Sequence, residues 1–176
     1  LRDLRQPRVG LDGDRAPFGD ATPDELEAAF AEQAATLAAA GADLFCIETM
    51  SDLTEATRAV RAAKTAAPHL AVMATMTFEP TPRGYFTIMG VSIAKAVAGL
   101  EEAGADVVGS NCGTGIEDMP AIAREMARHT GRPIAVQPNA GLPEITEGRV
   151  VYRETPEAMA ARVPELLDAG VAIVGG

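Results

Sequence analysis

The residues best suited to chemistry in this chain stand at the ends of short apolar runs. Cys112 follows Asn111 at the end of one run, just before a glycine-containing loop, while Glu48 ends an earlier run and Asn139 a later one. Runs of this kind predict parallel strands, whose carboxyl ends meet on one face where α/β enzymes house their chemistry. We therefore expect these side chains to share one site.

Each of these groups has a chemical and a structural interpretation. The thiolate of Cys112 could bind a metal ion, although a single cysteine after a strand is more often a small buried hydrophobe. The carboxylate of Glu48 could bind the ammonium group of an amino-acid substrate, pair with a loop arginine, or cap the helix that begins near Asp52. The amide of Asn139 could bind a substrate carboxylate or form the turn before Gly141.

Three other residues in these runs also have a functional and a structural interpretation. Asn111 either touches a ligand or orients the loop of Cys112. Thr75 and Thr77 end another apolar run, so their hydroxyls would contact substrate or bond to the backbone inside the same mouth. Cys46 lies in the middle of a run without a partner motif, and we expect it in the core.

Six apolar runs predict strands, and helical patterns alternate with them. The runs lack polar alternation, as expected of strands covered on both faces, and they span residues 8–11, 42–48, 70–77, 106–111, 133–137 and 171–174. Helices are expected after the cap Thr22, after Ser51 or Asp52, and over residues 92–103, 117–129 and 156–169. Residues 79–84 are expected to form a loop near the site, and residues 143–152 a loop or a short hairpin.

The spacing of these βα units points to an eight-stranded barrel. It is nearly constant and lacks a glycine-rich dinucleotide fingerprint, which favours a closed (βα)8 barrel over an open doubly wound sheet. Six units are not eight, and a barrel without two strands would expose unpaired edges. Since the sequence begins on Leu1 and stops on Gly176 directly after a strand, we expect residues 1–176 to be part of a longer barrel.

Composition excludes several classes of protein. The net charge of −10 is spread along the helical segments, which argues against nucleic-acid binding. No run approaches the roughly 18 apolar residues that span a bilayer, so we expect a cytoplasmic protein without a membrane partner. Two cysteines, both in apolar runs, do not form a disulfide framework.

Five motifs in order resemble the homocysteine S-methyltransferase family, which includes the homocysteine-binding domain of cobalamin-dependent methionine synthase and betaine–homocysteine methyltransferase. They cover nearly all of the chain from about Val9 onward. The motifs are Ile47-Glu48-Thr49, Met73-Ala-Thr-Met-Thr-Phe78, Gly109-Ser-Asn-Cys112-Gly-Thr-Gly115, Gln137-Pro-Asn-Ala-Gly-Leu-Pro143 and Val171-Ala-Ile-Val-Gly-Gly176.

The resemblance implies a (βα)8 barrel to which this chain supplies strands three to eight. It implies a catalytic zinc ion held by Cys112 and by a vicinal cysteine pair after Gly176, with the thiol of homocysteine in the fourth position. Glu48 is similar to the residue that contacts the homocysteine amino group, and Asn139, Asn111 and Thr75 are expected to line the substrate site. The first two strands and the Cys-Cys loop and helix would lie outside residues 1–176, so we expect these residues alone to be inactive.

The function implied is methyl transfer to homocysteine, giving methionine, from methylcobalamin, betaine or S-methylmethionine. Two other classes stay open. A phosphate-binding barrel enzyme without a metal would use Gly175 and Gly176 to bind an anion through backbone N–H groups. A non-catalytic barrel that binds a corrinoid or a protein would lack the vicinal cysteines.

Overall fold

Six parallel strands form the main sheet of this protein. The computed structural model describes residues 2–4, 22–113, 115–141, 144–146, 149–152 and 154–175. The sheet order is β1-β2-β3-β6-β7-β10, and each strand runs parallel to its neighbours. The strands are β1 (Arg2–Leu4), β2 (Leu44–Met50), β3 (Ala71–Met76), β6 (Val107–Cys112), β7 (Ile134–Pro138) and β10 (Val171–Val174).

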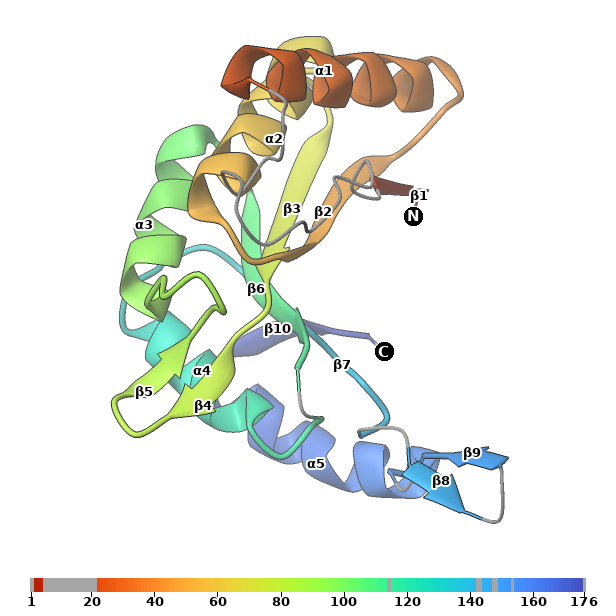
Figure 1. Cartoon of the computed structure of the whole chain (residues 1–176), viewed down its shortest axis with the longest axis vertical. Coiled ribbons are helices and arrows are strands. Elements are labelled where there is room, and N and C mark those ends of the chain that lie inside the picture. Colours follow the sequence, from red (N-terminus) through yellow and green to blue (C-terminus); the bar gives the residue numbers. More distant parts are fainter. Residues whose placement is uncertain are drawn as a thin grey trace.

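Five helices connect these strands in sequence and lie along one side of the sheet (Figure 1). They are α1 (Pro23–Ala39), α2 (Leu53–Ala66), α3 (Ile93–Ala103), α4 (Met119–Ala127) and α5 (Pro156–Asp168). A doubly wound sheet reverses its strand order and carries helices on both faces. Here the order never reverses, so the described part is an arc of the kind that forms a barrel wall, with β1 and β10 at its edges.

The structure confirms five predicted strands and all five helices, and it corrects the bounds of one helix and the prediction of one loop. The strand predicted at residues 8–11 lies outside the described residues, and the first strand described is β1, which pairs with β2. Residues 79–84, predicted as a loop, belong to an antiparallel hairpin of β4 (Glu79–Thr81) and β5 (Gly84–Phe86). The hairpin alternative for residues 143–152 is confirmed by β8 (Glu144–Thr146) and β9 (Arg149–Val151). Helix α4 is shorter than predicted, because residues 117–118 and 128–129 form turns.

The two faces of the sheet enter different apolar clusters. Phe45, Ile47 and Val72 belong to the large cluster that includes buried residues of the helices, whereas Cys46 and Met73, at alternating positions, belong to a second, smaller one. This alternation is the two-residue period of a strand. Cys46 is only 2% exposed, which confirms its prediction as core.

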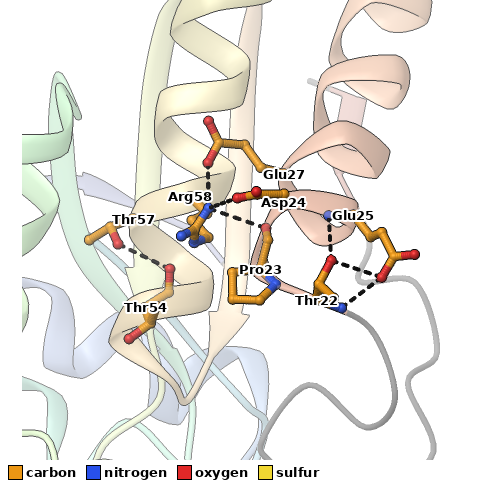
Figure 2. Close-up of polar contacts among 8 residues, drawn as sticks. All are labelled: Thr22, Pro23, Asp24, Glu25, Glu27, Thr54, Thr57 and Arg58. Carbon is orange, nitrogen blue, oxygen red and sulfur yellow. Dashed lines mark hydrogen bonds and ion pairs between the residues drawn. The ribbon is translucent and has the colours of Figure 1, made fainter.

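Side-chain caps and one arginine fix the first two helices (Figure 2). Thr22, the predicted cap, forms a capping box with Glu25 at the start of α1. Arg58 of α2 donates to the carbonyl oxygen of Pro23 at 3.2 Å and to the Glu27 carboxylate at 2.9 Å. These contacts join the amino-terminal turn of α1 to the side of α2.

An ion pair joins the turn after α3 to the preceding βα unit. Gly104 ends α3 in a left-handed conformation (φ 105°), and Asp106 two residues later accepts from Lys64 Nζ at 2.5 Å and from the Val72 N–H at 2.8 Å. Partial burial opposes ionisation of Asp106, but these two hydrogen bonds outweigh it and hold the pKa of this carboxyl below its ordinary value. Ionised Asp106 is therefore stabilised by folding.

The stability that Asp106 provides should depend on pH. A carboxyl whose pKa is lower in the folded state stabilises the protein above its unfolded pKa of about 3.9, and this contribution disappears as the pH falls through the folded pKa. We expect Asp106→Asn to lower the urea midpoint at pH 7 and to leave it nearly unchanged at the lowest pH where the protein stays folded. A difference between the two proteins that stays constant from pH 7 to pH 3 would contradict this assignment.

Candidate active site

Asn111 is the centre of a hydrogen-bond network at the carboxyl ends of three strands. Its side chain is 3% exposed, and its Oδ1 accepts from the backbone N–H of Thr49 at 2.8 Å and from the hydroxyl of Thr75 at 2.7 Å. Its Nδ2 donates to Thr49 Oγ1 at 2.6 Å and to Cys112 Sγ at 3.3 Å. One amide therefore holds together the ends of β2, β3 and β6.

The network contains three of the residues predicted from the sequence and one that sequence reasoning missed. Thr75, Asn111 and Cys112 come together as expected, and Thr49 joins them. Thr49 belongs to the Ile47-Glu48-Thr49 motif, which indicated that it lies near the site. Nothing in the sequence indicated that Thr49 is a hydrogen-bond partner of Asn111. Thr77 also bonds to this region, donating from its hydroxyl to the carbonyl oxygen of Asn111 at 3.1 Å.

The backbone is strained at two members of the network. Thr49 (φ 63°) and Cys112 (φ 59°) are the non-glycine residues with positive φ in the part of the chain that the structure describes. The left-handed conformation costs an L-residue roughly 1–2 kcal/mol, and such strain clusters at functional sites. Both strained residues contact Asn111, whose hydrogen bonds help to stabilise the two turns.

Cys112 lies at the end of β6, is partly exposed, and accepts a hydrogen bond at its sulfur from the Asn111 amide. Besides the Asn111 amide, the hydroxyl of Thr49 lies 3.7 Å from Cys112 Sγ. A donor directed at sulfur suits a thiolate, the form in which cysteine binds metal ions. The arrangement therefore provides one oriented thiol at the carboxyl-end edge of the parallel sheet.

Glu48 lies near the carboxyl end of β2, and Asn139 directly follows β7, with β3 and β6 between these two strands in the sheet. The thiol of Cys46 donates to Glu48 Oε2 at 3.7 Å, which indicates that both side chains lie on the same face of β2. Asn139 follows β7, and its Nδ2 donates to the carbonyl oxygen of Gly113 at 3.1 Å. Asn139 therefore contacts the loop that begins directly after Cys112.

Two further contacts to that loop were not predicted. Glu154 Oε2 accepts from the backbone N–H of Ile116 at 3.1 Å, and the hydroxyl of Tyr85 in β5 donates to Asp118 at 2.9 Å. Burial, followed by this hydrogen bond and the charge of Asp118, raises the pKa of Tyr85, so the hydroxyl keeps its proton and stays a donor. Glu154 carried no usable signal, since it precedes the helix cap Thr155 and is far from Ile116 in sequence.

The residues that the structure describes do not form a metal site by themselves. Within those ranges, no three His, Cys, Asp or Glu side chains lie close enough together to hold a metal ion. Cys112 fits the role of one thiolate ligand by its chemistry and partial exposure, but a site with three protein ligands would need others. Across the same described ranges, no helix is long and apolar enough to cross a membrane.

Comparison with known proteins identifies the family. The model of the homocysteine S-methyltransferase family matches residues 6–176. The chain belongs to the homocysteine S-methyltransferase family. The resemblance seen in the five sequence motifs is thus confirmed, and Cys112 and Asn111 lie within the matched region of this homocysteine S-methyltransferase domain.

The relatives of this homocysteine S-methyltransferase domain are longer proteins. Methionine synthase of Mycobacterium tuberculosis is 33% identical over 153 residues, which is 84% of this chain and 13% of that protein. The metallated form of the homocysteine methyltransferase MmuM from Escherichia coli superposes with a TM-score of 0.70 at 22% identity, over 93% of this chain and 49% of that one. Its apo form gives 0.69 at 22% identity, over 89% and 52%. At these identities the two structures show a shared fold, and the chain spans about half of that fold's length.

Proposed function

We propose that this domain forms part of a zinc-dependent enzyme that transfers a methyl group to the thiol of homocysteine, giving methionine. The observation that carries the proposal is the thiol of Cys112, oriented by Asn111 at the end of β6. Family membership supports this reaction over the phosphate-binding barrel, which has no use for an oriented thiol. Under this proposal the chain supplies the last six strands of the barrel.

Zinc suits the chemistry that methyl transfer to a thiol requires. A free thiol with a pKa near 8.5 is only about 3% ionised at pH 7. Coordination to zinc deprotonates a bound thiol, and this is what the ion would supply to homocysteine. Cys112 would be one protein ligand, and the two further cysteines that the family resemblance implies would complete the site.

The remaining site residues divide into substrate contacts and positioning residues. Glu48 is our candidate for binding the homocysteine ammonium group, and Asn139 for binding its carboxylate. Asn111 and Thr75 are buried and bonded to each other, which supports the structural interpretation of both. Their contact with substrate stays a prediction.

The methyl donor is the least determined part of this proposal. Methylcobalamin, betaine and S-methylmethionine are the three candidates. Methylcobalamin is the first to test, because a relative that is 33% identical over 84% of this chain is a methionine synthase. The site residues named above bear on homocysteine and do not discriminate among the three.

Zinc content of the full-length protein tests the proposal directly. We expect about one zinc per protein, lost in Cys112→Ala together with methionine formation from homocysteine. Cys46→Ala is the matched control, because it also removes one thiol, but from a buried core position. This variant should keep its zinc. A zinc-supplied protein that binds none, or a Cys112→Ala variant that keeps its zinc, would reject the metal site. Absence of zinc would favour one of the two metal-free alternatives, the non-catalytic barrel or the phosphate-binding barrel.

A further inference from the structure

We infer that Glu154 is a positioning residue for Cys112, acting through residues 113 and 115–118 of the loop between β6 and α4. The functional part of this inference rests on the role proposed above for Cys112. Glu154 contacts neither the thiol network nor, by the site assignments above, the substrate. Its contribution would be to fix the backbone that follows the thiol.

The carboxylate of Glu154 bridges two segments of the barrel mouth. Glu154 Oε2 accepts from the N–H of Ile116 at 3.1 Å, and the side chain of Ile116 is buried. The backbone N–H of Glu154 donates to the carbonyl oxygen of Ala140 at 3.3 Å, which attaches Glu154 to the turn after β7. Glu154 therefore ties the loop after β6 to the segment after β7.

Two glycines leave the space that this carboxylate occupies. A Cβ atom on Gly115 would overlap Glu154 Oε1, and a Cβ atom on Gly141 would lie 3.4 Å from Glu154 Cγ. Gly115 also has a φ of 140°, which side chains with L chirality rarely adopt. The carboxylate thus lies directly against the backbone of both loops. A larger residue at position 115 would fill the space that the carboxylate occupies.

Glu154 is not needed to begin the helix that follows it. The hydroxyl of Thr155 accepts from the N–H of Ala158 at 3.3 Å and caps α5. The carboxylate of Glu154 instead accepts from the backbone N–H of Ile116. Its side chain is therefore available for a role in the mouth rather than in local helix formation.

The loop is fastened at three points, with Glu154 in the middle. Asn139 holds its first residue, Gly113, and Tyr85 holds its last, Asp118. Cys112 directly precedes the loop and has a left-handed backbone, so the direction of its side chain depends on where Gly113 continues. Release of the central tether would allow the loop to open and would loosen the orientation of the thiol.

Hydrogen exchange and thiol alkylation of the metal-free protein test this inference. Loss of a hydrogen bond to a charged group corresponds to roughly a tenfold change in a local opening equilibrium. We expect Glu154→Ala to speed exchange of the Ile116 amide about tenfold and alkylation of Cys112 several-fold. Cys46 is buried, and mass spectrometry of the peptide that contains Cys112 separates its alkylation from that of any other thiol in the full-length protein.

Three variants separate the hydrogen bond from charge and from general damage. Glu154→Gln keeps an oxygen that can accept from Ile116 and should stay close to the parent protein. Glu154→Asp keeps the charge on a shorter side chain and should shift both rates in the direction of Glu154→Ala, which provides a milder change if the alanine variant unfolds. Glu157→Ala removes an exposed carboxylate three residues away and should change neither rate.

The inference is overturned if Glu154→Ala leaves exchange at Ile116 unchanged, or if Glu154→Gln behaves like Glu154→Ala. Equal acceleration by Glu157→Ala would also overturn it. These measurements need neither zinc nor homocysteine. A full-length protein that binds no zinc but shows the expected exchange pattern would reject the proposed function and leave the tether standing.

Discussion

Asn111→Ala is expected to lower the free energy of unfolding by about 3 kcal/mol. The substitution removes four hydrogen bonds, two accepted by Oδ1 and two donated by Nδ2. It leaves the hydroxyl of Thr75, which is fully buried, without its acceptor. A buried polar group that loses its partner costs about 1–3 kcal/mol, more than the net gain from forming the bond. Urea denaturation followed by circular dichroism measures the change.

Asn139→Ala is the matched control for this prediction. It deletes the same side chain at a neighbouring strand end, but it removes a single hydrogen bond, to Gly113, from a partly exposed position. We expect a cost of about 1 kcal/mol. If the two variants proved equally stable, Asn111 would not be the centre of the network. Faster alkylation of Cys112 in Asn111→Ala would further show that the amide orients the thiol.

The position of the site could be predicted because the local pattern of apolar and polar residues shows where each strand ends. Apolar runs identify β2, β3, β6 and β7, and parallel strands bring their carboxyl ends together. This pattern predicts that Thr75, Asn111 and Cys112 lie together, and the structure joins them by hydrogen bonds. Cys46 was assigned to the core by the same pattern.

The contacts that the sequence did not reveal are those made between distant segments. The positive φ of Thr49 depends on Asn111, 62 residues away, and a β-branched residue gives no local indication of a left-handed turn. Glu154 meets Ile116 across 38 residues. The hairpin of β4 and β5 was read as a loop because two prolines interrupt it, although a proline is tolerated on the edge of a two-stranded sheet.

Gly109→Ala is expected to cost about 3 kcal/mol or more, because it inserts a methyl group where the sheet has no room. Gly109 lies in the middle of β6, paired with Thr75 of β3 and Ala135 of β7. A Cβ atom there would collide with the backbone carbonyl oxygen of Ala135 and would lie 3.0 Å from Thr75 Cγ2. A backbone atom of a paired strand cannot move aside as a flexible side chain can, so the strands themselves would have to separate.

Gly131→Ala is the control that isolates this effect. Gly131 lies between α4 and β7 and has no atom within 4 Å of an added Cβ, so alanine there should change the free energy of unfolding by less than about 0.5 kcal/mol. The prediction fails if Gly109→Ala is as stable as Gly131→Ala in urea.

Because Gly109 precedes Asn111 by two residues and contacts Thr75, displacement of β6 should also disturb the network. Gly109→Ala should therefore speed alkylation of Cys112, whereas Gly131→Ala should not. These results would show that the close approach of β7 to β6 requires a glycine at position 109. They would also show that the orientation of the Cys112 thiol depends on this packing of the two strands.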